Sequence, residues 1–388
     1  MTGKLSIRDL SMGGALLIIC SFFVLHPKGK YFLTPQNLSN MSIELAITAI
    51  LALGMLLVLL AGKIDLSAGS GVGMLGGLAS VLIIRPDYIF GVHMAGWPAP
   101  LALLATLLTG VAIWYLMGCL IAYQKVPAFI ITLGGLLIFK GIHWTVIRNS
   151  TIPVSPGREE NIYSVLTTYY FPEWAGYLLF VLVSVLIIRA AVKNRKSRRM
   201  HGFELEPADI AFLKTFIGIQ IILLLVVVMN LHKGLPLSLV ILGGVVWLIQ
   251  TITRNTPFGR YLYAVGGNED AARLSGIPVE KVVVGAYVLM GAIVALTGCM
   301  QTAYGGYSTS TVGNLMELDA IAACVIGGTS LKGGRGTVLG VLFGALLMTT
   351  LLNGMTLLAV SPETKLIARG SVLILAVWMD IYLARKKN

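Results

Sequence analysis

Charged residues are scarce in this 388-residue chain: Asp, Glu, Lys and Arg make up 12% of it, against about 25% in a typical soluble domain. Hydrophobic residues make up 56%, and the mean hydropathy is +0.85. So few charges cannot cover the surface of soluble domains, although the length alone would allow two or three of them. We therefore expect a single transmembrane domain over residues 1–388.

Motifs of nucleotide hydrolysis and of hydrolytic catalysis are also missing. The Gly-Lys pairs at Gly3, Gly29 and Gly62 are not followed by the Ser or Thr of a phosphate-binding loop. There is no G-x-S-x-G nucleophile and no H-E-x-x-H zinc motif, and the four cysteines lie in apolar segments without metal-ligand spacing. We expect this chain to have no catalytic residue and to bind no metal or cofactor, so any energy must come from another polypeptide.

Apolar stretches long enough to cross a bilayer recur along the whole chain. About 20 apolar residues in a helix span about 30 Å of hydrocarbon, and a helix satisfies its own backbone groups in lipid. The candidate segments are residues 10–25, 43–62, 67–84, 99–122, 127–147, 174–190, 212–231, 236–253, 282–303, 337–357 and 365–384. A shorter apolar piece, 318–327, suits half a span or a re-entrant segment. The sequence predicts an all-α polytopic membrane protein with about ten to twelve transmembrane helices, including broken or re-entrant glycine-rich segments.

Positive charge exceeds negative charge, giving a net charge of +12. If the amino terminus is cytoplasmic and each segment crosses once, 20 of the 29 Lys and Arg lie on the cytoplasmic side, as the positive-inside rule requires. We expect both termini in the cytoplasm. The densest cluster is 189–199, and we expect 189–214 to form a basic cytoplasmic loop near anionic membrane lipids. No aromatic residues interleave this cluster, so we expect no nucleic-acid partner.

Asp65 follows one span directly and precedes a span that is rich in glycine and serine. An ionisable group within a membrane domain is a functional candidate, and a glycine-rich helix can break to line a pathway. Two interpretations stay open: Asp65 lines a translocation path, or it caps the next helix from the cytoplasmic interface.

Further basic residues lie within or beside the spans. Lys140 can extend toward the outer surface or pair with Glu44 near the outer end of the second span. His143 has no partner at metal-ligand spacing. Lys365 and Arg369, at the outer start of the last span, are expected to anchor it at the interface.

A second glycine-rich anomaly covers residues 317–340, with Asp319 at the outer membrane boundary. The polar turn between its two Gly-Gly pairs cannot face lipid, so it must be buried in protein or line a wet cavity. We expect the translocation path to be lined by hydroxyl, amide and backbone groups and a few acids. The candidates are Asp65, Ser67, Gly69, Ser70, Asp319, Thr329, Ser330 and Asn353.

Residues 266–281, GGNEDAARLSGIPVEK, are charged and turn-forming between two apolar segments. Asn268 is a good N-cap, acids follow it in the first turn, Gly276 suits the position after the helix, and Pro278 ends it. We predict a helix of about seven residues, roughly 10 Å long, which would melt alone in water. Its apolar residues are expected to enter a groove, either in a partner or within the chain's own loop; they are Ala271, Ala272 and Leu274.

Four stretches resemble, in order, the permease subunits of bacterial ATP-binding cassette (ABC) importers for monosaccharides, such as the ribose, galactose and xylose systems. They are GKIDLSAGSGVGMLGG (62–77), KVPAFIITLGG (125–135), YAVGGNEDAARLSGI (263–277) and ELDAIAACVIGGTSLKGGRGTVLG (317–340). The resemblance covers about residues 35–385, and the extra length around 148–214 looks most like the xylose-type branch. One departure is Lys63, where the family pattern has a neutral or acidic residue; Lys63 is placed to pair locally with Asp65.

The resemblance implies that the cytoplasmic loop 254–281 couples this chain to a separate ATP-binding subunit, which would hold ATP and Mg. It also implies a permease homodimer, an extracytoplasmic sugar-binding protein and a place in the bacterial cytoplasmic (inner) membrane. The expected coupling residues are Gly267, Asn268, Glu269, Ala271, Arg273, Leu274, Ser275 and Gly276.

We interpret the chain as the membrane-spanning permease subunit of an ATP-driven sugar importer. Its expected cargo is xylose or a related pentose, moved by alternating access. A secondary carrier of a small polar solute, driven by an ion gradient, is the alternative, and a scaffolding protein without uptake is a third interpretation.

Overall fold

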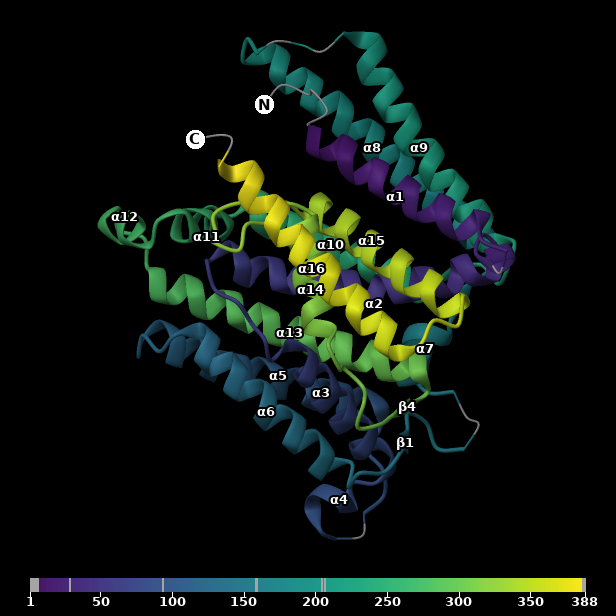
Figure 1. Ribbon diagram of the computed structural model, residues 1–388, viewed down its shortest axis with the longest axis vertical. Coiled ribbons are helices and arrows are strands. Elements are labelled where there is room, and N and C mark those ends of the chain that lie inside the picture. The colour runs from purple at the N-terminus through teal and green to yellow at the C-terminus, as the bar shows by residue number, and fades with distance from the viewer. Residues whose placement is uncertain are drawn as a thin grey trace.

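The computed structural model describes residues 7–27, 29–92, 94–157, 160–203, 205 and 207–385. Most of these residues are helical, and very few are in strands (Figure 1). The helices are α1 (Ile7–Leu25), η1 (Gly29–Tyr31), α2 (Pro35–Leu60), α3 (Ala68–Ile84), α4 (Asp87–Phe90), α5 (Ala99–Ala122), α6 (Ala128–Val146), α7 (Ile162–Thr168), α8 (Glu173–Met200), α9 (Ala208–Asn230), α10 (Leu237–Asn255), α11 (Pro257–Gly267), α12 (Glu269–Leu274), α13 (Val279–Gly305), α14 (Met316–Ile326), α15 (Val338–Leu357) and α16 (Pro362–Arg385). The strands are β1 (Ile152–Pro153), β2 (Tyr170–Phe171), β3 (Leu235–Pro236) and β4 (Tyr307–Ser308), paired antiparallel as β1 with β4 and β2 with β3.

The expected membrane segments are all helices. Eight of the described helices are long and apolar enough to cross a membrane: α2, α5, α6, α8, α9, α10, α13 and α15. The other three expected segments correspond to α1, α3 and α16, and the shorter apolar piece corresponds to α14. The prediction of an all-α polytopic membrane protein is confirmed.

The core of the protein is built around α2. Every residue from Ala49 to Leu60 is buried, as expected for a helix that is apolar on all sides. α13 packs against α2, α3 and α5, and glycines permit the closest of these approaches. A Cβ added to Gly110 of α5 would lie 2.8 Å from the carbonyl oxygen of Gly291 in α13, and one added to Gly76 of α3 would lie 2.6 Å from that of Gly298. Small residues at helix crossings are typical of membrane proteins.

Both glycine-rich stretches form broken elements. An irregular segment, 61–67, precedes α3, and a second one, 327–337, separates the 11-residue α14 from α15. The two segments meet, since the amide of Gly334 donates a hydrogen bond to the carbonyl of Leu60, 3.1 Å away. Their backbone is therefore buried in protein, where irregular structure is tolerated within a membrane domain.

Different structural elements lie at the two ends of the helical bundle. α11 and α12 lie at the same end as the start of α1 and the end of α16, on the left of Figure 1. β1, β4 and α7 lie toward the opposite end (Figure 1). Any cavity near β4 is thus separated from α12 by the length of the bundle.

The expected basic loop over 189–214 is mostly helical. α8 continues through the cluster to Met200, and α9 begins at Ala208, so only about 201–207 connects them. Ala, Lys and Arg have high helix propensity, and no glycine or proline interrupts them before Gly202. Gly202 has φ +68°, the left-handed conformation that commonly follows a helix end.

Candidate functional site

α12 begins and ends where its capping residues predict. The Oδ1 atom of Asn268 accepts a hydrogen bond from the amide of Ala271 at 2.9 Å, and Glu269 and Asp270 occupy the first turn. The helix ends at Leu274, and Gly276 has φ +78°. An N-cap side chain, early acids and a left-handed glycine are sufficient signals for a short helix, and the predicted helix is confirmed at six residues.

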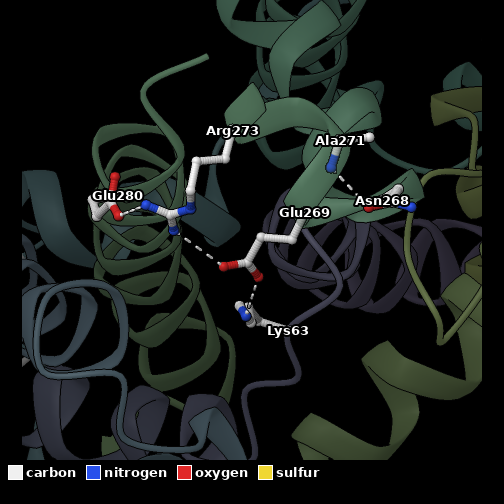
Figure 2. Close-up of polar contacts among 6 residues, drawn as sticks. All are labelled: Lys63, Asn268, Glu269, Ala271, Arg273 and Glu280. Atoms are coloured by element: carbon white, nitrogen blue, oxygen red, sulfur yellow. Dashed lines mark hydrogen bonds and ion pairs between the residues drawn. The ribbon is translucent and has the colours of Figure 1, made fainter. Parts of the chain in front are cut away.

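A chain of charged side chains holds α12 against the bundle (Figure 2). The Nζ atom of Lys63 lies 3.1 Å from Oε2 of Glu269, whose Oε1 lies 3.6 Å from Nη2 of Arg273. Arg273 also donates a 2.5 Å hydrogen bond from Nη1 to Glu280 at the start of α13. The Glu280 carboxylate raises the pKa of the Arg273 guanidinium above its ordinary value, because it stabilises the charged form. α12 is thus tied to the segment before α3 and to α13.

The expectation that Lys63 pairs with Asp65 is wrong. Lys63 pairs with Glu269, which lies 206 residues further along the chain, and Asp65 has other partners. The irregular segment 61–67 directs Lys63 toward α12 and Asp65, two residues later, into the core, where Asp65 is completely buried. The departure at Lys63 therefore belongs to the attachment of α12.

The apolar residues of α12 divide between the two sides of the helix. Ala272 is 4% exposed and packs with the core, whereas Leu274 is 90% exposed. Ala271 is also exposed. Of the three residues expected to enter a groove, only Ala272 does so within this chain, and Leu274 is left open for contact with another protein.

α11 connects α12 to both glycine-rich segments. A Cβ added to Gly266 would lie 1.8 Å from the carbonyl oxygen of Leu60 and 2.5 Å from the amide nitrogen of Gly334. Tyr263 of α11 donates a hydrogen bond to the carbonyl of Gly336 at 2.9 Å. Because backbone meets backbone here, a displacement of α11 and α12 must displace the segments before α3 and α15.

Asp65 accepts three hydrogen bonds in the core. The amide and the Oγ of Ser67 lie 2.8 and 2.6 Å from its Oδ1, and the Nε1 of Trp114 lies 2.6 Å from its Oδ2. Trp114 is itself completely buried and packs on Phe139. Asp65 is therefore enclosed in protein, and its geometry is that of a buried acceptor that fixes the irregular segment to α5.

A polar cavity of ≈ 420 Å³ lies toward the end of the bundle opposite α12. The starts of α2, α14 and α16, the ends of α13 and α15, and the segment after β4 line it. Its volume is in the range of pockets for small molecules. The charged and amide side chains among its lining residues are Glu44, Gln301, Asn314, Asp319 and Arg369.

Arg369, which was expected to anchor the last span at the interface, lies on this cavity wall. Its Nη2 atom is 3.2 Å from Oδ2 of Asp319, and both residues line the cavity. Across the cavity, Glu44 accepts a hydrogen bond from Tyr304 at 3.0 Å. Opposite charges and hydroxyls thus face one polar space within the membrane domain.

Three buried polar atoms on the cavity-lining residues have no hydrogen-bond partner among the described residues. They are Oδ1 of Asp319, Oγ1 of Thr349 and Nε of Arg369. Buried polar atoms are nearly always satisfied by protein, water or a ligand. The residues that line the cavity thus carry both hydrogen-bond acceptors and donors, the groups that a small hydroxylated molecule requires.

A smaller cavity of ≈ 130 Å³ is lined by Ser70, Lys140, His143 and Glu317, and it shares residues 312–314 with the larger one. The expected Lys140–Glu44 pair is absent from the described contacts: Lys140 lies over the ring of Trp144, while Glu44 contacts Tyr304. The Nε2 of His143 lies 3.2 Å from the Oγ of Ser308. Within the described residues, no group of three His, Cys, Asp or Glu side chains is placed to hold a metal.

The remaining path candidates lie outside both cavities. Ser67 and Gly69 pack at the start of α3, and Thr329 and Ser330 are buried in the segment between α14 and α15. Asn353 supports the larger cavity from behind, because its side chain contacts those of Asn37 and Glu44. Of the eight candidates, Asp319 and Ser70 line a cavity.

Sequence reasoning missed several lining residues. Thr349 and Gln301 lie in long apolar helices, where single polar residues give a weak signal, and Glu317 stands within the second glycine-rich stretch without having been singled out. Trp114 was also missed. Treating every acidic residue of the membrane domain as a functional candidate would have identified Glu317. No local sequence signal marks Trp114 as the partner of Asp65.

Comparison with known proteins gives consistent matches along the chain. Residues 37–377 match the family model described as branched-chain amino acid transport system / permease component. The chain is 36% identical to the xylose transport system permease protein XylH of Escherichia coli K12, over 97% of this chain and 92% of that protein. It is 36% identical to XylH of Haemophilus influenzae, over 94% of each chain, and 32% identical to the ribose import permease protein RbsC of E. coli K12, over 95% and 92%. No solved structure matches it.

The matches agree with the described structure. The family model spans α2 to α16 almost completely, which includes both broken elements, α12 and the residues of the polar cavity. The relatives are permease proteins of transport systems and cover nearly the whole chain. The chain therefore belongs to the family of branched-chain amino acid transport system permease components, and it is a multi-pass membrane transport subunit, not an enzyme.

Proposed function

We propose that this chain is the membrane subunit of an ABC importer that carries xylose or a related pentose inward by alternating access. The observation that carries the proposal is the 36% identity to two xylose permeases over almost the whole chain. ATP and Mg would bind to a partner ATPase, since this chain has no phosphate-binding loop.

The two ends of the bundle suit two different partners. The exposed Leu274, on a helix held by ion pairs, supports docking of the ATPase on α12. The coupling residues from Gly267 to Gly276 would then transmit its movement through α11 to the two glycine-rich segments. In this proposal α12 and both chain termini are cytoplasmic, and a sugar-binding protein delivers its cargo at the opposite end. A second copy of the chain and the lipids of the inner membrane complete the proposed assembly.

The larger cavity is the proposed outer part of the translocation path. A pentose presents hydroxyl groups that both donate and accept hydrogen bonds, and the lining residues Asp319, Thr349 and Arg369 carry complementary groups. Movement of the segments beside Gly62 and Gly333 would open the path toward α12, because these segments meet there.

The direct test is uptake and ATP hydrolysis in proteoliposomes that contain the chain, its ATPase and its binding protein. We expect xylose to stimulate both activities more than other pentoses and hexoses do. Stimulation by a different sugar would support the ABC-importer mechanism but would show that xylose is not the transported sugar. Uptake that ignores ATP and follows an imposed ion gradient would refute the proposal in favour of a secondary carrier, a role for which Glu44, Glu317 and Asp319 would be available.

Arg369→Gln is expected to lower uptake at least about tenfold, the equivalent of one hydrogen bond to a charged group. Asp319→Asn should do the same, and combining the two substitutions should not restore uptake if both groups contact the sugar. Recovery in the double variant would show that the 3.2 Å pair only balances charge. Lys365→Gln is the matched control, because Lys365 lies on the same helix outside the cavity lining.

A further inference from the structure

The α8–α9 hairpin stands apart from the rest of the bundle, at the top of Figure 1. The two helices pack against each other, and α9 also contacts α2. Among the described residues of these two helices, only Gly176 and Ser184 of α8 and Val226 and Met229 of α9 are buried. Most of this hairpin therefore faces its surroundings.

A groove of ≈ 720 Å³ runs between α8 and α9. One part of its lining is apolar and includes the rings of Phe212 and Phe216, which stack with their centroids 5.9 Å apart. The other part includes three basic residues, Arg195, Arg198 and Lys214. The groove thus has an apolar wall and a cationic rim.

The position of the groove along the hairpin matches the edge of a membrane. α8 has 28 residues, which at 1.5 Å per residue is about 42 Å, longer than the roughly 30 Å of hydrocarbon. Its apolar part ends at Arg189, and the groove is lined by residues 188–198 of α8 and 208–219 of α9. The groove therefore extends from the hydrocarbon region into the polar headgroup layer.

The charge of this region favours an anionic occupant. Residues 189–214 contain seven Lys or Arg and three Asp or Glu, a formal charge of +4. Two hairpins of this charge would repel each other, which disfavours a second copy of the chain in the groove. Arg guanidinium groups bind phosphate in a bidentate manner, and basic pockets between transmembrane helices bind anionic lipid headgroups.

We propose that the groove between α8 and α9 is a binding site for one anionic phospholipid of the bilayer. The acyl chains lie along Phe212, Phe216 and Ile219, and the phosphate lies at Arg195, Arg198 and Lys214. The site fastens an otherwise sparsely packed hairpin to the membrane surface at the end of the bundle that carries α12.

The test compares lipid retention by the purified full-length chain in native mass spectrometry. The probes are phosphatidylglycerol and phosphatidylcholine with the same acyl chains. We expect a preference for phosphatidylglycerol of at least about tenfold, which falls to about parity when Arg195, Arg198 and Lys214 are all replaced by Gln. The matched control replaces Lys193, Lys196 and Arg199 by Gln, which removes the same charge from residues outside the groove lining, and should keep the preference.

Equal loss in both triple variants would overturn the proposal, because it would indicate diffuse attraction to the whole basic helix end. The proposal would also be overturned if the variant with Gln at Arg195, Arg198 and Lys214 kept its preference for phosphatidylglycerol, whatever its oligomeric state. Ala211→Trp offers a test that leaves the charges in place: a large ring in the groove should reduce retention of phosphatidylglycerol, and unchanged retention would argue against occupancy of the groove by the acyl chains.

Discussion

Leu274→Asp is expected to reduce ATP-driven uptake at least about 30-fold while the chain stays folded in the membrane. Leu274 is 90% exposed at the end of α12, so its replacement removes no contact within the chain, and exposed substitutions seldom change stability by more than about 0.5 kcal/mol. In the proposed complex, however, the leucine would enter an apolar pocket of the ATPase, where a carboxylate would be desolvated without a partner. Loss of a central interface residue commonly costs about 2 kcal/mol or more, the equivalent of about 30-fold in affinity.

The measurement is uptake together with co-purification of the ATPase with the membrane chain. Leu231→Asp is the control, because Leu231 is 69% exposed but follows α9 at the other end of the bundle. Normal uptake by Leu274→Asp at normal expression would rule out α12 as the docking element. Equal losses in both variants would show that the effect is not specific to α12.

Gly266→Ala is expected to destabilise the folded chain by about 3 kcal/mol and to lower uptake with it. The added Cβ would lie 1.8 Å from the Leu60 carbonyl oxygen and 2.5 Å from the Gly334 amide nitrogen. Both are backbone atoms, so a side-chain rotation cannot relieve the overlap. α11 would have to move away from the two glycine-rich segments, which disrupts the backbone contacts of Gly266 with Leu60, Gly333 and Gly334.

Gly267→Ala is the matched control for stability, because a Cβ there would meet no atom within 4 Å. Thermal unfolding of both variants in detergent distinguishes the two outcomes: the melting temperature of Gly266→Ala should fall by several degrees, and that of Gly267→Ala should stay near the unsubstituted value. Equal melting temperatures for the two variants would show that α11 is not packed tightly against these segments.

Elements whose formation depends on residues nearby in the sequence could be predicted from the sequence. The membrane helices follow from apolar runs, because the bilayer requires about 20 such residues whatever surrounds them. α12 follows from Asn268, Gly276 and Pro278, whose effects on the backbone reach only three or four residues. The same local chemistry predicts the helical continuation of α8 from its Ala, Lys and Arg residues; the loop interpretation gave too much weight to their charge.

The partners of the polar residues could not be predicted in the same way. Lys63 lies two residues from Asp65, yet it pairs with Glu269, while Asp65 accepts from Trp114. Arg369, expected at the interface, faces Asp319. A buried charge takes the best partner that packing brings near it, and that partner lies 206, 49 or 50 residues away in these three cases.

The sequence by itself determined the class of the protein, the place of its apolar membrane segments and the ends of α12, since each of these rests on hydropathy or on capping within a few residues. Only the tertiary structure decided which side of α12 is open, that Leu274 projects while Ala272 is buried, and that Thr349 and Arg369 share a cavity with Asp319. These features arise where α2, α13, α14, α15 and α16 cross. The geometry of those crossings is set by glycine contacts and helix packing over the whole bundle, and no single stretch of sequence contains it.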